Sequence, residues 1–405
     1  MHLKYIKKCR VCESDLNPIL DLGAQFLQGA FVKGSVKPPL RKIPLEIGFC
    51  DPAMNENACG LVQLMHSVPP EILYKKYWYR SGTNRTMTNH LTNLASEIME
   101  RFKPSSILDI GCNDGTFLKA FPKSVKRTGV DPSDAALSID NDIEVVRSCF
   151  PSSKKIEGPF DVVSSFAMLY DLDDPIMFLR AVTRVLSRRG VFVFEVAYLP
   201  TMMKNVAFDN ICHEHLEYYS FAVLENMLGA VGMRIFDVRL TDTNCGSILC
   251  FADGGYERKD FNEFTISRIR EKEFEMALDS EETYIDFSKA VLKRIADVRD
   301  LIQRLRGLGK NIHIYGSSTK GNVLIQACGL DRWIEFAADR NPEKHGAETL
   351  GTKIRIISEE ESRAMKPDYY LVLPWHFKTE FLEREKAMRE AGVKFIFPFP
   401  TLEIL

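Results

Sequence analysis

The pattern of apolar and polar residues changes twice along the chain and divides it into three parts. Residues 1–70 show little strong periodicity and are rich in cysteine, proline and glycine, so they would bury little core alone. Through residues 87–102 apolar positions recur every three or four residues, which predicts an amphipathic helix. Short apolar runs then alternate with helical patterns, such as that of residues 175–190, up to about residue 258. This alternation predicts a parallel sheet covered on both faces.

The last third of the chain begins with a long charged segment. Residues 260–308 have a helical, highly charged sequence that we expect to bridge two domains. From residue 311 a second series of strand and helix patterns follows, and it also opens with a glycine turn. We therefore predict an α/β protein of three domains, spanning residues 1–70, 71–258 and 259–405.

Composition and charge narrow the functional classes. The chain has 405 residues and a formal net charge of −2, so there is no global basic field to drive nucleic-acid or membrane binding. No apolar run reaches the roughly 18 residues of a membrane span, and the first residues lack the apolar core of a signal peptide. We expect a cytoplasmic protein, in which cysteines stay reduced.

A glycine turn follows the first apolar strand of the middle domain, in the sequence ILDIGCNDG (107–115). Its pattern is G-x-x-x-G with an acid two residues before the first glycine, rather than the G-x-G-x-x-G of dinucleotide sites. An acid there suits a cationic ligand such as the amino-acid part of S-adenosylmethionine. A second acid ends the next strand, where a carboxylate can accept hydrogen bonds from two ribose hydroxyls. An ordinary strand–turn–helix corner would explain the glycines alone. With both acids present, the pattern resembles the class I methyltransferases and predicts a cofactor site of Asp109, Gly111, Asn113, Gly115, Asp131 and Pro132.

Four of the ten cysteines lie in the first domain. Cys9 and Cys12 form a C-x-x-C knuckle, and Cys50 and Cys59 follow at a looser spacing. Four thiolates can close a tetrahedral structural zinc site with no open position for catalysis. The alternative is four unrelated reduced cysteines, but a segment with so little core of its own needs a metal or another cross-link to fold. The quartet therefore predicts a structural Zn²⁺ ion.

Taken together, these features resemble the sugar-nucleotide C-methyltransferases, such as the S-adenosylmethionine-dependent 3-C-methyltransferases that act on nucleotide-linked 4-keto-6-deoxyhexoses. The resemblance covers nearly the whole chain. It implies a zinc-binding N-terminal domain, a class I methyltransferase domain with a Rossmann-like sheet, and a second Rossmann-like domain that helps to hold the nucleotide sugar. The stretches that carry it are CRVC (9–12), CGLVQL (59–64), YWYRSGTN (77–84), ILDIGCNDG (107–115), FDNICHEHLEYYS (208–220), YGSSTKGNVLIQACGL (315–330) and the C-terminal LPWHF and REAGVKFIFPFP.

The resemblance also implies a chemistry. Carbon–carbon bond formation beside a C4 ketone requires a base for the C3 hydrogen and stabilisation of the enolate oxygen. Histidine suits the first task, and the family's glutamate–histidine pair maps onto Glu214 and His215. His215 is the expected base, Glu214 would orient or tune it, and Tyr79 is a candidate donor to the enolate oxygen. The purely structural alternatives are a loop histidine bonded to the backbone and a tyrosine that only packs.

The neighbours of this pair have less specific roles. His213 is expected to be a solvated neighbour or a substrate contact. Some relatives carry a tyrosine where this chain has Cys212, and a thiol is a poor hydrogen-bond donor. Any role of that tyrosine would be lost or would move to Tyr218 or Tyr219, which leaves the substrate and its stereochemistry open.

Several residues are candidates for binding the substrate. Lys204 matches a lysine of the family and could meet a phosphate or sugar oxygen, although a solvated surface lysine fits equally well. In the third domain, a strand ends and a helix begins at YGSSTKGN, where backbone amides attract anions, although this could be a simple helix start. We expect Ser318, Lys320 and Asn322 to bind the diphosphate or nucleotide, and Trp375 and His376 to line the same cleft.

Three other functions match parts of the sequence. A zinc metalloprotease motif, H-E-x-x-H, would need a histidine at position 217, which is Glu217. A zinc-knuckle methyltransferase acting on RNA or protein is an alternative, but for RNA the near-neutral charge disfavours it. A protein that binds S-adenosylmethionine or a nucleotide sugar without turnover is the third. The nucleotide (dTDP, GDP or CDP), the methylated carbon, and the pathway (surface polysaccharide or secondary metabolite) stay open, and we expect a monomer with no nucleic-acid or membrane partner.

Overall fold

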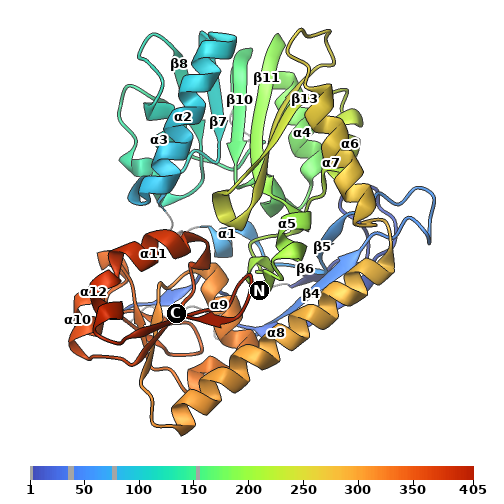
Figure 1. The fold of residues 1–405 in the computed structure, drawn as a ribbon. Helices are drawn as coiled ribbons and strands as arrows, with labels where there is room; N and C mark the ends of the chain where they lie inside the picture. The colour runs from blue at the N-terminus through green and yellow to red at the C-terminus, as the bar shows by residue number, and fades with distance from the viewer. Residues whose placement is uncertain (1–2, 35–40, 75–79, 152–155) are drawn as a thin grey trace.

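The computed structural model describes residues 3–34, 41–74, 80–151 and 156–405. The described chain forms three main sheets, with the middle sheet, built from strands within residues 106–253, at the top of Figure 1 and the N-terminal and C-terminal sheets below it. No helix in these ranges combines the length and apolarity that crossing a membrane would require.

Three strands of the N-terminal segment and the short strand β12 form a four-stranded antiparallel sheet. Its strand order is β12–β5–β4–β2, and its inner face is fully buried at Leu45, Ile47 and Phe49. The face packs against the long helix α8, so this segment shares its core with the C-terminal half of the chain. The elements are β1 (Lys4–Tyr5), β2 (Asn17–Gln25), β4 (Ile43–Phe49), β5 (Val62–Leu64), β6 (His66–Ser67), α1 (Pro70–Leu73) and β12 (Glu217–Tyr218).

The middle sheet has seven strands in the order β13–β14–β11–β10–β7–β8–β9, with β14 antiparallel to both neighbours. The glycine turn follows β7, which lies in the middle of the sheet between β10 and β8. The helix predicted over 87–102 is α2, and the helix predicted over 175–190 ends earlier because β11 begins at Leu186. The strands are β7 (Ser106–Ile110), β8 (Lys126–Val130), β9 (Glu144–Val146), β10 (Phe160–Phe166), β11 (Leu186–Ala197), β13 (Arg234–Thr241) and β14 (Ser247–Asp253). The helices are α2 (Arg85–Phe102), α3 (Thr116–Lys119), α4 (Pro175–Val185), α5 (Leu199–Lys204) and α6 (Phe221–Gly229).

Two helices follow the middle sheet and differ in what they contact. Helix α7 (Glu263–Glu275) packs against β13 and α6, so the predicted boundary at residue 258 falls before a helix that covers the middle sheet. Helix α8 (Glu281–Gly307) contacts β2 of the N-terminal sheet and α9 of the C-terminal unit. It runs beneath the N-terminal sheet towards the C-terminal unit, as Figure 1 shows, which fits the predicted bridge.

The C-terminal unit has a parallel core in the order β20–β19–β15–β16–β18, with antiparallel strands at both edges. One edge strand, β3 (Phe31–Val32), comes from the N-terminal segment and pairs with β17, so the first and third units are interlocked. The other elements are β15 (Ile312–Tyr315), α9 (Thr319–Cys328), β16 (Phe336–Ala338), β17 (Glu348–Thr349), β18 (Arg355–Ile357), α10 (Glu359–Ala364), β19 (Tyr369–Val372), α11 (Lys378–Arg384), α12 (Lys386–Glu390), β20 (Lys394–Phe397) and β21 (Glu403–Ile404).

Candidate active site

A single cavity of about 1560 Å³ opens between the middle sheet and the C-terminal unit. Sites for one small ligand measure roughly 300–1,000 Å³, so this cavity has room for two. Its walls include the glycine turn after β7 and the second turn after β15. The candidate base, His215, lines the same cavity.

The first glycine turn has the backbone expected of a ligand cradle. Gly111 and Gly115 have φ values of 79° and 75°, which favour glycine, and a Cβ on Gly111 would lie 3.2 Å from Met168. Asp109 is buried at the end of β7 and accepts a hydrogen bond from the Ser164 hydroxyl at 2.7 Å. Burial raises the pKa of Asp109 to about 7. Among the described residues no ion pair joins Asp109 to a cation, so the ammonium of a bound amino acid could pair with this carboxyl.

Asp131 ends β8 and closes the turn from the other side. Its Oδ2 accepts from the backbone N–H of Asn113 at 2.8 Å, and its Oδ1 accepts from the N–H of Ser133 at 2.7 Å. Both Asp131 and Pro132 line the cavity. The residues predicted for the cofactor therefore all line the cavity, except Gly115. Gly115 precedes α3, and its positive φ allows the chain to turn into that helix.

Arg80 lines the cavity but was not among the predicted site residues, although it lies in the stretch YWYRSGTN (77–84). It lies just before a segment that docks on the turn, because Ser81 N–H donates to Asn113 at 3.1 Å and Gly82 N–H donates to Asp114 at 2.8 Å. The Nη1 atom of Arg80 is buried, and it has no hydrogen-bond partner among the described residues. Its signal in the sequence was a basic residue directly before a small-residue pair, in the stretch YRSG. Tyr79, the predicted site residue of that stretch, lies outside the described residues.

His215 is held by the backbone. Its Nδ1 lies 2.9 Å from the carbonyl oxygen of Asn210. A carbonyl can only accept, so Nδ1 carries the hydrogen and Nε2 keeps its lone pair. The Tyr170 ring meets the imidazole edge-on, with centroids 4.6 Å apart. Burial and the Lys320 charge lower the pKa of His215 to about 3, so the ring is neutral. The backbone bond expected of a merely structural histidine is present, and it leaves the other nitrogen able to accept a proton.

Glu214 does not orient His215. Within the described residues no hydrogen bond joins the two side chains, and the imidazole takes its orientation from Asn210. The Glu214 carboxylate lies against Gly29, where a Cβ would collide with Oε1, and its buried Oε2 has no partner among the described residues. Burial raises the pKa of Glu214 to about 7. Because Glu214 lines the cavity, its free oxygen is available to a ligand.

The other polar residues of this loop have structural positions. His213 is buried, with Nδ1 2.7 Å from Gln28 Oε1, so the predictions of a solvated residue or a substrate contact are wrong. The phenols of Tyr218 and Tyr219 bond to the carbonyl oxygens of His215 and Leu169, and neither lines the cavity. Cys212 is also fully buried, beneath the cavity wall.

The four predicted substrate residues separate into two groups. Ser318 caps α9 by accepting from Gly321 N–H at 3.1 Å, and Lys320 donates to the Asn244 carbonyl at 3.1 Å; both line the cavity. Asn322 is buried away from the cavity and donates to the Gln28 carbonyl at 2.6 Å, so it anchors the N-terminal segment. Lys204 is exposed at the end of α5 and does not line the cavity, as expected if it is a solvated surface lysine.

The two aromatic candidates also differ. His376 lines the cavity, whereas Trp375 is buried, does not line it, and donates to Asp209 at 3.0 Å.

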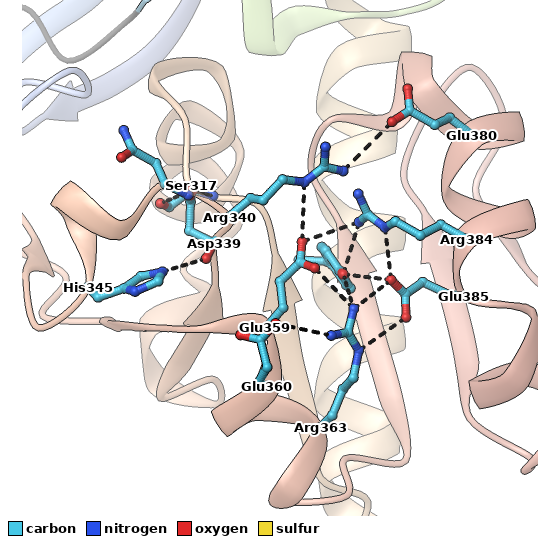
Figure 2. Close-up of polar contacts among 12 residues, drawn as sticks. Ser317, Asp339, Arg340, His345, Glu359, Glu360, Arg363, Glu380, Arg384 and Glu385 are labelled. Carbon is cyan, nitrogen blue, oxygen red and sulfur yellow. Dashed lines mark hydrogen bonds and ion pairs between the residues drawn. The ribbon is translucent and has the colours of Figure 1, made fainter. Parts of the chain in front are cut away.

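The turn after β15 repeats the hydrogen bonds of the turn after β7. Gly316 N–H donates to Ala338 as Gly111 N–H does to Val130. Asp339, at the end of β16, accepts from the N–H of Ser317 and of Asn341, both at 2.8 Å, which matches the two bonds that Asp131 accepts. Figure 2 shows Ser317 hydrogen-bonded to Asp339 and, beside this pair, a network of arginines and glutamates. Asp339 was not predicted, although an acid ending the strand after a glycine turn was the signal used for Asp131.

The arginine–glutamate network lies where the C-terminal unit forms the cavity wall. Arg363 donates to Glu385 at 2.8 Å and to Glu359 at 3.0 Å, and Arg384 bridges the same two acids. Arg340 reaches towards Glu359 at 3.7 Å from the end of β16 (Figure 2). These contacts fix α10 and α11 around the second turn, so the wall there is built of paired charges.

The four predicted zinc ligands converge although they come from distant segments. The sulfurs of Cys9, Cys12, Cys50 and Cys59 all lie within 4.8 Å of one another, with Cys9–Cys59 at 3.5 Å and Cys12–Cys50 at 3.3 Å. A tetrahedral ZnS₄ centre with bonds of about 2.3 Å has sulfurs about 3.8 Å apart. All ten cysteines are free thiols, so no disulfide competes for these sulfurs. The donor set fits a closed structural zinc site.

Comparison with known families divides the chain in the same order. A candidate zinc binding domain matches residues 9–74, a methyltransferase domain matches 79–238, and a C-methyltransferase C-terminal domain matches 242–400. With the fold and the two sites above, this defines a zinc-binding, S-adenosylmethionine-dependent methyltransferase. The three matches follow one another with short gaps from residue 9 to residue 400, and the description of the third names C-methyltransferases.

One curated relative matches along its whole length. The C-methyltransferase NovU of Streptomyces niveus is 28% identical over 414 residues, covering 99% of this chain and 97% of NovU. Among solved structures, an S-adenosylmethionine-dependent methyltransferase of Clostridium acetobutylicum has a TM-score of 0.35 at 14% identity, covering 42% of this chain and 92% of that one. The magnesium protoporphyrin IX methyltransferase of Synechocystis PCC 6803 has a TM-score of 0.33 at 14% identity, covering 42% and 87%. TM-scores of this size carry no argument about function.

Proposed function

We propose that the enzyme methylates a nucleotide-linked 4-keto-6-deoxy sugar at the carbon beside the ketone, C3. The observation that carries the proposal is the neutral His215 imidazole, with its Nε2 lone pair, in a cavity that is also lined by the glycine turns after β7 and β15. A ketone acidifies the neighbouring C–H, so removal of that proton is the step for which such an imidazole is suited.

In this proposal His215 accepts the C3 proton at Nε2. Its low pKa keeps the ring in the basic form but makes it a weak base. The enolate formed beside it provides a negative charge that stabilises the imidazolium. Glu214, whose carboxyl has a raised pKa, would donate a hydrogen bond to the enolate oxygen while it is protonated.

We assign the cofactor to the first turn. Asp109 would bind the ammonium of S-adenosylmethionine, Arg80 its carboxylate and Asp131 its ribose hydroxyls. The buried carboxyl of Asp109 and the Nη1 of Arg80, which has no hydrogen-bond partner among the described residues, complement the two charges of an amino acid. S-adenosylmethionine supplies an electrophilic methyl group on a sulfonium.

We assign the nucleotide of the substrate to the second turn. The N-terminus of α9 and the Lys320 ammonium favour its diphosphate, with Ser318 at the same helix end. Asp339 would face the ribose of the nucleotide, as Asp131 would face the ribose of the cofactor. Tyr79 remains a candidate donor to the ketone on the resemblance alone.

The test is incubation with S-adenosylmethionine and a panel of nucleotide-linked 4-keto-6-deoxy sugars, followed by mass spectrometry. The expected product is heavier by one methyl group, with the new carbon at C3 by NMR. In deuterium oxide, the parent enzyme should exchange the C3 hydrogen and His215→Ala should not. Absence of a methylated product across dTDP-, GDP- and CDP-linked sugars would reject the proposal, and unchanged exchange in His215→Ala would reject His215 as the base.

A further inference from the structure

Arg10 lies inside the zinc knuckle, between Cys9 and Cys12, but its side chain does not face the sulfurs. The side chain is 3% exposed. Its Nη1 donates to the Leu64 carbonyl at 2.7 Å, and its Nη2 donates to the Ser67 hydroxyl at 2.8 Å. Its backbone N–H is also held, by Gln63 Oε1 at 2.8 Å. The guanidinium is therefore fixed against β5, which contains Leu64, and β6, which contains Ser67.

The same guanidinium faces the segment that carries the candidate base. Glu217 lies two residues after His215, its side chain has no exposure, and its Oε1 is 3.5 Å from Arg10 Nε. Within the described residues neither carboxylate oxygen of Glu217 has a hydrogen-bond partner. Burial raises the pKa of Glu217 well above its ordinary value, and the nearby Arg10 charge opposes that rise only in part. Strand β12 joins the N-terminal sheet here, because Glu217 pairs with Gln63 and Leu64 N–H donates to the Leu216 carbonyl at 2.8 Å.

Arg10 also reaches the second segment that touches the imidazole. Ser67, which accepts from Arg10, donates to Asp173 Oδ1 at 2.6 Å, and Asp173 lies 3.8 Å from Arg10 Nε. This segment includes Tyr170, whose ring meets that of His215 and whose carbonyl accepts from Leu216 N–H at 2.7 Å. One buried cation in the zinc knuckle thus holds both segments that enclose the base.

We propose that Arg10 is a positioning residue for His215: through Glu217 and Asp173 it holds the two segments that keep the imidazole buried and bonded to Asn210. The zinc knuckle then serves the reaction by presenting this arginine to the catalytic loop. The proposal takes His215 to be the base, as above, but its test measures the imidazole and the loop instead of turnover. Failure of either idea can therefore be seen without the other.

The test compares Arg10→Met, Arg10→Lys and Glu217→Gln with the parent protein. Arg127→Met is the matched control, because Arg127 is also buried and pairs with Asp142 at 3.0 Å, in the middle sheet. Zinc content and thermal unfolding report on the fold. The readouts are the His215 titration, followed by NMR of ¹³C-labelled histidine and assigned with His215→Asn, and hydrogen exchange of the amides in 211–219.

In the parent, the His215 signal should stay that of a neutral ring into the acid range. In Arg10→Met and Glu217→Gln the loosened loop admits water, so the pKa of His215 should rise by about one unit or more towards its ordinary value. Amide exchange in 211–219 should become about tenfold faster or more. Arg10→Lys keeps the charge and should recover part of both effects, and Arg127→Met should show neither.

Two results would overturn the proposal. The first is a folded, zinc-bound Glu217→Gln protein with the His215 titration and loop exchange of the parent. The second is loss of fold or of zinc in Glu217→Gln, because the pair would then hold the domain rather than the loop. If Arg10→Met does not fold, Glu217→Gln and Arg10→Lys decide between these outcomes.

Discussion

Replacing Arg80 by methionine should weaken binding of S-adenosylhomocysteine but not of methylthioadenosine. The two ligands share the adenosine and the sulfur, and only the first carries the amino-acid carboxylate. In the structure, Nη1 of Arg80 is buried beside the first glycine turn with no partner among the described residues. A carboxylate placed there would therefore form a new charge-assisted hydrogen bond without displacing an existing one.

The magnitude follows from that single contact. A hydrogen bond to a charged group contributes about 1.5–3 kcal/mol, which corresponds to about a 10- to 150-fold loss of affinity. Isothermal titration calorimetry of both ligands on the parent and on Arg80→Met measures the loss directly. Arg80→Lys keeps the charge without the planar fork, so its affinity for S-adenosylhomocysteine should fall between the two.

Methylthioadenosine serves as the internal control, because a general disturbance of the turn would weaken both ligands. Equal losses for the two ligands would show that Arg80 supports the turn and does not bind the carboxylate. An unchanged affinity for S-adenosylhomocysteine in a folded Arg80→Met protein would refute the reasoning altogether.

Two further predictions concern protons and zinc. Burial raises the pKa of Asp109 to about 7, above its value of about 4 in the unfolded chain, so the ligand-free protein should lose stability as the pH rises from about 4 through 7. An ammonium beside Asp109 favours the ionised form, so S-adenosylhomocysteine should release up to one proton at about pH 6, seen in the buffer dependence of the binding heat. Asp109→Asn should release none, and equal release would contradict the assignment. Cys9→Ser/Cys12→Ser should lose zinc by metal analysis and unfold at a lower temperature, while zinc retained at the parent level would contradict the quartet.

The predicted fold class, which rested on the order of patterns along the chain, is confirmed. The alternation of apolar runs and helical patterns predicted the parallel sheets, because burial on both faces requires such runs. The first glycine turn and its two acids were readable because they follow consecutive strands, and parallel strands place their carboxyl ends at one edge. Asp339 obeys the same rule, because it directly follows β16, the strand that comes after the second glycine turn.

The errors concern residues whose environment depends on other segments. His213 and Asn322 looked available for a substrate, but both bond to Gln28, which is remote in sequence. Lys204 carries the expected charge and points into solvent. No local pattern distinguishes a polar residue that faces a cavity from one that anchors a neighbouring domain.

The sequence by itself determined the three-part order, the methyltransferase class and the zinc ligands, since these depend on residue type and spacing. Tertiary structure alone decided which nitrogen of His215 keeps its lone pair, because the Asn210 carbonyl fixes the tautomer. It also decided that Glu214 faces the cavity and that Arg10 faces Glu217. Burial, hydrogen-bond direction and charge pairing arise only when distant segments meet, and these quantities decide what each side chain can do.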